Sequence, residues 1–258
     1  MIKSITIGSL TIGREQANFF LHDAVGFESP DIRLAAFNLP GQHGAKFSNA
    51  LWGKRVMRIE GRVMGATAAA YQTNRQTVEL NVDLRDGLRL MQFTMENADA
   101  WQAYIILSSP IEMAFRRGQM TFADFRLELT AFDPNFYSQT EHDQSIAKSA
   151  TETINNAGNT ETYPTVIING PIATSATLNN TTTGESATFT IALGGGDHLD
   201  INFKERTVVK DDTTNQYSSF SGDWWELAAG NNSIQLTTGD GGDTGNAVVY
   251  WRDAVIGV

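Results

Sequence analysis

The chain contains no cysteine, which excludes disulfide bonds, thiolate metal sites and cysteine nucleophiles and allows folding in a reducing compartment. No segment approaches the ~18 consecutive apolar residues that a membrane-spanning helix needs. The first eight residues alternate like a strand and lack the apolar block of a signal peptide. We therefore expect a protein without a membrane anchor that is made and folded in a cytoplasm.

Signatures of catalysis are missing as well. The sequence has no Gly-x-Ser-x-Gly nucleophile elbow and no Gly-x-x-x-x-Gly-Lys phosphate loop. The histidines share no i, i+4 helical face and form no His-Glu-x-x-His pattern, which argues against a zinc or catalytic role. They are His22, His43, His142 and His198. We predict that the chain is not an enzyme and has no catalytic residue, cofactor or metal.

Two segments rich in glycine and aspartate leave a narrower question open. Residues 194–200 (Gly-Gly-Gly-Asp-His-Leu-Asp) and 239–243 (Gly-Asp-Gly-Gly-Asp) resemble calcium loops in composition. Neither has the EF-hand spacing. The same residue types make ordinary hairpin turns, because glycine supplies positive φ and aspartate caps the turn. We interpret both segments as turns, with a cation site as the alternative.

Positive charge is scarce in the second half of the chain. Residues 1–140 hold 14 Lys and Arg against 14 Asp and Glu, whereas residues 141–258 hold 5 against 15. The whole net charge of −10 therefore belongs to the second half. Such an acidic surface favours solubility and repels nucleic acid and anionic membranes, so we expect no nucleic-acid contact.

Strand patterning dominates what is present. The 41% apolar and 10% aromatic content supports a folded core, and apolar and polar residues alternate along segments such as 55–64 and 120–132. One helix is predicted at about residues 67–86, where Tyr71, Val78 and Val82 fall close to one stripe and Gly87 ends it. Residues 41–54, rich in Gly, Asn and Ser, are expected to form a loop.

The last third of the chain carries the clearest pattern. Residues 226–238 and 246–254 alternate and are expected to form two strands of one sheet, with Trp251 in the core. Turn signals recur about every 8–12 residues after a boundary at 138–162, which is typical of a sandwich or jelly roll. We predict a mainly β protein. An N-terminal β-sandwich or split-barrel domain with one α-helix spans 1–140, and a C-terminal β-sandwich spans 141–258.

Two sets of side chains are candidates for contacts with other molecules. Arginines occur along the strands of the first half, and because that half is neutral we interpret them as subunit-interface residues rather than a nucleic-acid site. They are Arg55, Arg58, Arg62, Arg116 and Arg117. Aromatic residues near 217–225 are suited to stacking on a sugar or a protein, although one of two adjacent tryptophans should face the core. These candidates for outward contact are Tyr217, Trp224 and Trp225.

The order of these elements, together with several short motifs, resembles the distal tail proteins of long-tailed, non-contractile bacteriophages. The likeness covers most of the chain. It rests on an aromatic-Asp-Pro junction after the first domain and on a closing turn and strands. The matching residues are Phe132, Asp133 and Pro134 at the junction, then Gly230, Asn232, Ile234, Val248, Trp251 and Arg252.

This resemblance implies a structural protein of the virion tail tip. Its N-terminal domains are expected to form a hexameric ring around a central channel, and its galectin-like or jelly-roll C-terminal domains to project outwards. The ring would join the tail tube protein to the tail-tip hub protein and serve as a platform for receptor-binding, host-attachment proteins. The alternative, based on the aromatic residues, is a carbohydrate-binding β-sandwich adhesion module.

Overall fold

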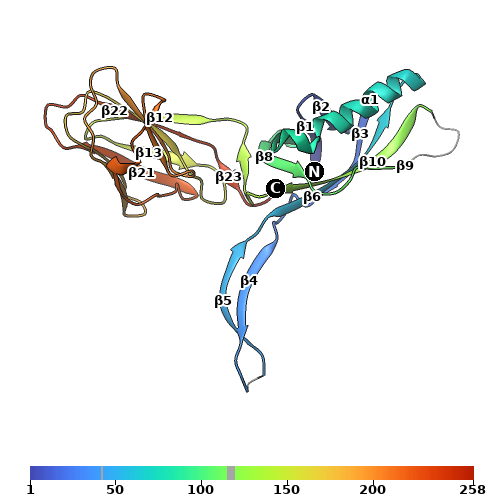
Figure 1. The fold of residues 1–258 in the computed structure, drawn as a ribbon, viewed down its shortest axis with the longest axis horizontal. Helices are drawn as coiled ribbons and strands as arrows, with labels where there is room; N and C mark the ends of the chain where they lie inside the picture. The colour runs from blue at the N-terminus through green and yellow to red at the C-terminus, as the bar shows by residue number, and fades with distance from the viewer. Residues whose placement is uncertain (42, 115–119) are drawn as a thin grey trace. The chain divides into compact units, whose positions relative to one another are not determined.

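The computed structural model describes residues 1–41, 43–114 and 120–258. The chain divides into two compact units: unit 1 comprises Met1–Gln139 and Ile256–Val258, and unit 2 comprises Thr140–Val255. The prediction that every residue after 140 belongs to the second domain is therefore wrong for the last three, which return to unit 1. Both units are mainly β, as the alternation predicted (Figure 1). Within the described ranges, no helix is long and apolar enough to cross a bilayer.

Unit 1 is a sheet that closes on itself. Its strands are β1 (Ile2–Ile7), β2 (Leu10–Gly13), β3 (Phe19–Val25), β6 (Arg55–Met64), β7 (Arg89–Met95), β8 (Ala100–Leu107), β9 (Glu112–Ala114), β10 (Phe122–Ala131) and β11 (Phe136–Ser138). They lie in the order β11-β8-β7-β1-β2-β3-β6-β10-β9. Strand β8 also pairs with β10, opposite Leu129 and Thr130. This second pairing closes the strands from β8 round to β10 into a barrel, and closure removes most exposed strand edges.

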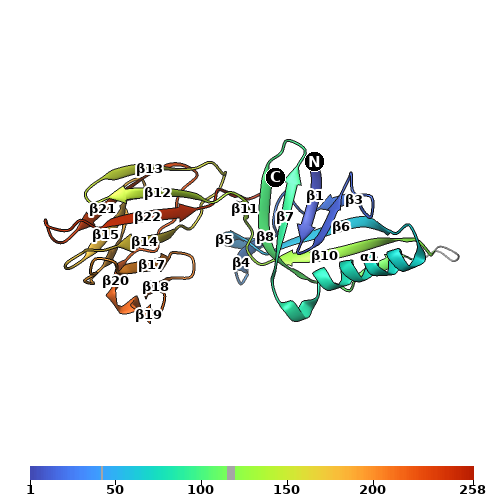
Figure 2. The same cartoon turned by 90° about the horizontal axis from the view of Figure 1, so that it is seen from above.

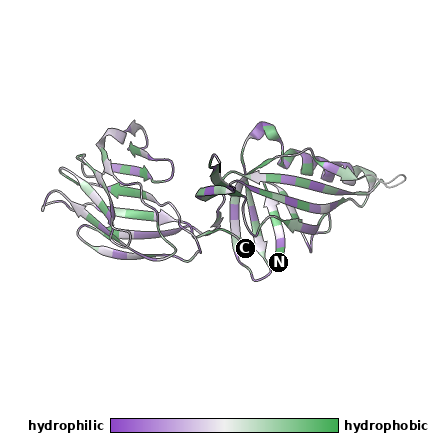
Figure 3. Ribbon diagram, turned by 90° about the horizontal axis from the view of Figure 1, so that it is seen from below, coloured by the Kyte–Doolittle hydropathy of each residue, from purple (hydrophilic) through white to green (hydrophobic). Residues whose placement is uncertain are grey.

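Alternation along the strands fills the barrel. Strand β6 coincides with the strand predicted over 55–64, and its inward residues Met57, Ile59 and Val63 are fully buried. Figure 3 shows the same alternation as bands of hydrophobic and hydrophilic residues along single strands. Gly61 has no room for a side chain, because a Cβ there would lie 2.6 Å from the Phe20 carbonyl oxygen. Close approach of β3 and β6 therefore requires glycine at this position.

The helix is shorter than predicted. α1 (Ala68–Asn81) packs against β6 and β2 and buries Tyr71 and Val78. It ends at Asn81, whose side chain donates to the Thr77 carbonyl at 2.7 Å and accepts from the Ser9 N–H at 2.8 Å. Asp83 then caps a short 3-10 turn, η1 (Leu84–Asp86). A polar side chain that binds nearby backbone competes with helix propagation, so the predicted end near residue 86 is wrong.

Unit 2 is a sandwich of two sheets (Figure 2). One contains β12 (His142–Ala147), β22 (Asn246–Trp251), β14 (Thr165–Asn169), β17 (His198–Asn202), β18 (Thr207–Lys210) and β19 (Thr214–Asn215), in that order. The other contains β13 (Thr151–Asn156), β21 (Gly230–Thr238), β15 (Ala176–Asn180), β16 (Glu185–Phe189) and β20 (Phe220–Gly222). A 3-10 turn, η2 (Tyr217–Ser219), precedes β20, and β23 (Ala254–Val255) ends the unit.

The two closing strands lie in opposite sheets, so the prediction that they share one sheet is wrong. β21 pairs with β13 and β15, whereas β22 pairs with β12 and β14. Both bury alternate residues in one core, Ile234 and Leu236 from β21 and Ala247 and Val249 from β22. The loop over 239–245 crosses between the sheets. Trp251 is 9% exposed, which confirms its predicted place in the core.

Candidate functional site

An exposed β-hairpin is the most unusual surface of unit 1. We call it the arm: β4 (Ile32–Asn38) and β5 (Ala45–Trp52), which among the described strands pair with each other alone. The loop predicted over 41–54 is therefore wrong for Ala45–Trp52, which form β5, whereas Gly41 and Gly44, both with positive φ, lie in the turn between the strands. In Figure 1 the arm extends from unit 1 as a free ribbon. Every residue of β4 and β5 is exposed.

One face of the arm is apolar along its length. The directly opposite pairs on this face are Ile32 with Trp52, Leu34 with Ala50, and Ala36 with Phe47. Exposure reaches 69% for Leu34 and 64% for Phe47. The other face alternates with it and carries Arg33 opposite Leu51. An isolated two-stranded ribbon is marginally stable in water, and an exposed apolar face of this kind marks a surface that binds another molecule.

The base of the arm is fixed to the barrel by backbone hydrogen bonds. The Gly53 N–H donates to the Asp31 carbonyl at 2.7 Å, and the Asp31 N–H donates to the Lys54 carbonyl at 3.1 Å. Immediately after this closure the chain enters β6 at Arg55. The arm therefore emerges from the barrel at a defined point rather than from a loose loop.

Arg55 lies in the interior of unit 1, so its predicted role as an interface residue is wrong. Its side chain is 0% exposed and its guanidinium stacks on Phe136, 4.2 Å from the ring centroid. It donates to the carbonyls of Gly26 (3.1 Å), Pro134 (2.8 and 3.2 Å) and Ile256. Burial lowers the pKa of Arg55 to about 10, against the smaller opposing effect of the nearby Glu28 and Asp133 carboxylates. One buried arginine thus ties together segments that are distant in sequence.

Arg58 and Arg62 belong to a charged lattice on the outer face of the barrel. The directly opposite cross-strand pairs of β6 and β10 are Arg58 with Glu128, Glu60 with Arg126, and Arg62 with Asp124. The signs alternate both along each strand and between strands, and opposite charges facing each other stabilise a sheet. Sequence reasoning noted the arginines of β6 but missed the complementary order in β10.

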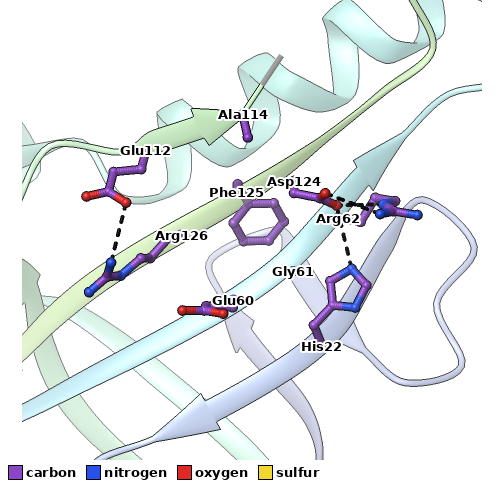
Figure 4. A pocket seen from close by; sticks show the side chains of 9 residues that line it. All are labelled: His22, Glu60, Gly61, Arg62, Glu112, Ala114, Asp124, Phe125 and Arg126. Atoms are coloured by element: carbon purple, nitrogen blue, oxygen red, sulfur yellow. Dashed lines mark hydrogen bonds and ion pairs between the residues drawn. The ribbon is translucent and has the colours of Figure 1, made fainter. Parts of the chain in front are cut away.

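Arg62 makes the tightest contact of this lattice. Its Nε and Nη2 donate to the two Asp124 carboxylate oxygens at 2.6 and 3.2 Å, and its guanidinium lies over Phe122. The hydrogen bond to Asp124 raises the pKa of Arg62. His22 Nε2 lies 3.7 Å from the same carboxylate. His22, Arg62 and Asp124 are among the residues that line a hollow of about 360 Å³ (Figure 4). Each of these charges on β6 therefore faces a side chain of opposite charge on β10. Arg116 and Arg117 lie outside the described residues.

The predicted aromatic contact residues separate into core and surface. Trp225 is 1% exposed and packs on Phe203 at 4.3 Å between ring centroids, so its predicted outward role is wrong. Trp224 is partly buried and stacks on Phe220 at 4.0 Å. Tyr217 is 51% exposed and its ring is nearly parallel to that of Trp224. The Trp224 ring therefore packs mainly against other side chains of the protein, and Tyr217 is the most exposed of the three predicted contact residues.

A lysine occupies the cation-like loop over 239–243. The Lys148 ammonium donates to the carbonyls of Asp240, Gly241 and Asp243 at 2.6–3.1 Å. Three convergent carbonyl oxygens would otherwise suit a metal cation. Here they hold an ammonium, which supports the interpretation of this segment as a structural turn.

The closing motif of the chain has a structural explanation. Gly230 has φ +87°, and the buried Asn232 side chain bonds the backbone of the same turn. Its Oδ1 accepts from the Ala228 N–H at 2.9 Å, and its Nδ2 donates to the Ala228 and Gly230 carbonyls. At the other end, Arg252 pairs with Glu141 at 3.3 Å. These residues build the sandwich rather than a binding site.

Comparison with known proteins identifies what the fold is similar to. The family model of the siphovirus-type tail component, C-terminal domain, matches residues 157–253. The Dit protein of phage SPP1, described as a paradigm of the hub adsorption apparatus in phages that infect Gram-positive bacteria, superimposes with a TM-score of 0.74 at 14% identity. That alignment covers 97% of this chain and 98% of the SPP1 protein. No curated protein sequence matches the chain.

A second solved structure shows the same architecture. A chain of the phage P2 baseplate, in its activated conformation with calcium, aligns with a TM-score of 0.52 at 9% identity, over 97% of this chain and 98% of that one. At these identities the likeness shows the fold. With the family match over residues 157–253 it confirms the predicted resemblance to distal tail proteins and the mainly β fold class.

Proposed function

We propose that this chain is a structural subunit of a phage tail tip. Copies form a hexameric ring that joins the tail tube protein to the tail-tip hub protein and serves as a platform for host-attachment proteins. The observation that carries the proposal is the apolar face of the arm, on a fold shared with a distal tail protein along nearly the whole chain. In this proposal the chain is located in the virion tail and acts as a scaffold without catalysis.

A second copy of the chain is the occupant that we propose for the arm. Between residues 32 and 52 the sequence contains two charged side chains, Arg33 and Lys46. Both belong to cross-strand pairs that alternate with those of the apolar face. Unit 1 is otherwise balanced in charge, so its copies repel one another little. Burying the exposed parts of Ile32, Leu34, Phe47 and Trp52 together would contribute roughly 4–8 kcal/mol to each subunit interface, before the entropic cost of association is subtracted.

The ring also needs a second, different surface, because a closed ring is built from heterologous contacts. We assign Arg58 and Arg62 to this role, together with Arg116 and Arg117. The support is the placement of Arg58 and Arg62 on the outer barrel face, where half-exposed charges of both signs alternate. Arg55 is excluded from this set by its burial.

Native mass spectrometry of the purified full chain tests the proposal. We expect hexamers, six copies of the 28.2 kDa chain, either alone or after addition of the tube and hub proteins. The double variant Leu34→Asn/Phe47→Asn should dissociate to monomers while its circular dichroism spectrum is retained. Leu51→Asn is the matched control, since it alters the same hairpin on the opposite face.

Two outcomes would refute parts of this picture. Monomers of the unmodified chain in every mixture would contradict the ring. Hexamers of the double variant as stable as those of the unmodified chain would contradict the role of the apolar face and leave the ring itself intact.

A further inference from the structure

A group of metal-ligating side chains lies on unit 2, where β17 meets the turn between β18 and β19. His198 and Asp200 alternate on β17 and so share a face, and Asp212 lies in the turn. One donor atom from each lies within 4.8 Å of the other two, a grouping found once among the described residues. His198 Nε2 is 3.2 Å from Asp200 Oδ2 and 3.6 Å from Asp212 Oδ2.

These separations match the edges of a small coordination polyhedron. A tetrahedral zinc ion bound by nitrogen and oxygen at 2.0–2.2 Å holds neighbouring ligand atoms about 3.3 Å apart. The two distances from His198 Nε2 bracket that value. Imidazole combined with carboxylates suits a transition-metal ion such as Zn²⁺ better than Ca²⁺, which prefers oxygen ligands alone.

The orientation of His198 is set from its other side. Its Nδ1 lies 3.5 Å from Asp211 Oδ1, and the same carboxylate oxygen accepts the backbone N–H of His198 at 2.9 Å. In metal sites a carboxylate commonly orients the far nitrogen of a ligating histidine in this way. Asp211 therefore lies on the Nδ1 side of the ring, and Nε2 faces the two remaining carboxylates.

Asp200 supplies the observation that points most directly to a ligand. The side chain is 30% exposed, but its Oδ2 is shielded from solvent and accepts no hydrogen bond from any residue that the structure describes, although it lies 3.2 Å from His198 Nε2. A buried oxygen without a hydrogen-bond donor, next to a second carboxylate, is an arrangement that a divalent cation stabilises.

We propose that His198, Asp200 and Asp212 bind a divalent transition-metal ion of the zinc class, with water in the remaining position. The segment 194–200, interpreted from sequence as a turn with a cation site as the alternative, supplies two of the three ligands. Asp212, from a separate turn, supplies the third. This inference does not depend on the ring, because it concerns only residues of unit 2.

Cobalt absorption and calorimetry on the untagged full chain test this site. Titration with CoCl2 should produce the visible bands of tetrahedral Co²⁺ at one ion per chain, and ZnCl2 should displace them and raise the unfolding temperature. His198→Ala should abolish the bands, and Asp212→Asn should weaken binding at least tenfold. Asp212 is largely exposed, so this second variant keeps the fold.

His142→Ala is the matched control. His142 Nε2 lies 3.2 Å from Asp253 Oδ2, the same contact with a single carboxylate, and its loss should leave the metal titration unchanged. Absence of saturable binding to the unmodified chain would overturn the proposal, and so would equal losses in His198→Ala and His142→Ala. The His198 imidazole would then make only its contacts with the neighbouring carboxylates.

Discussion

Replacement of Arg55 offers the sharpest test of how unit 1 is held together. The guanidinium donates to carbonyls of Gly26, Pro134 and Ile256, which belong to segments far apart in sequence. Two substitutions separate the charge from the donors. Arg55→Met fills a similar volume without charge or donors, whereas Arg55→Lys keeps the charge but lacks the planar fork that reaches several carbonyls.

The two variants should differ in free energy of unfolding, with lysine the worse. Loss of the donors leaves buried carbonyls unsatisfied, at about 1–3 kcal/mol each. Methionine offsets part of this loss, because it removes the cost of burying a charge, the same burial that lowers the pKa of Arg55 to about 10. We expect a loss of about 1–3 kcal/mol for Arg55→Met and about 3–5 kcal/mol for Arg55→Lys.

Urea unfolding combined with hydrogen exchange measures this difference. Exchange of peptides spanning 26–28, 134–138 and 256–258 should accelerate together in both variants, and more in Arg55→Lys. Peptides from the interior of unit 2 serve as the internal control. A lysine variant as stable as the methionine variant would refute the reasoning, because it would show that a buried charge without the planar set of donors costs no more than the absence of both.

Two further predictions concern unit 2. Bonding to Glu226 raises the pKa of Tyr163 to about 12, which favours the neutral phenol in the fold. The stability it contributes is therefore present below pH 10 and lost as the pH rises toward 12. Tyr163→Phe should remove one late-titrating phenolate from the alkaline absorbance titration, with Tyr104→Phe as control. Asn232→Ala should lower the free energy of unfolding by about 2–4 kcal/mol, since it leaves buried turn groups unpaired. Tryptophan fluorescence in urea measures this loss, and the exposed neighbour substitution Asn231→Ala should change it little.

Alternation predicted those parts of the fold in which each strand has one buried face. Strand β6 and the inward residues of β21 and β22 could be predicted in this way, because burial of alternate residues follows directly from strand geometry. The same rule fails for β5, which has no buried face and whose composition between Gly41 and Lys54 is that of a loop. The choice of sheet for β22 was also out of reach, since the loop before it suits either a hairpin or a crossing.

The candidate sites were harder to predict because they depend on three-dimensional neighbours. Arg55 and Arg58 lie in the same strand, β6, and alternation places Arg55 on the inward face with Met57, but its charge favoured a surface position. The carbonyls and the Phe136 ring that accommodate the buried guanidinium are supplied by segments distant in sequence. The charged lattice required knowing that β6 and β10 pair in register. Asp212 is separated from His198 by a whole hairpin, so no local spacing marks the ligand group.

The way the arm joins the barrel allows its binding surface to evolve independently of the folding of the barrel. Its base is closed by the backbone bonds between Asp31 and residues Gly53 and Lys54, and none of its side chains is needed to fill the core. The length, twist and apolar pattern of the arm can therefore change by mutation while the barrel folds as before. Substitutions within these roughly twenty residues can create a surface for a new binding partner without altering the packing of the barrel core.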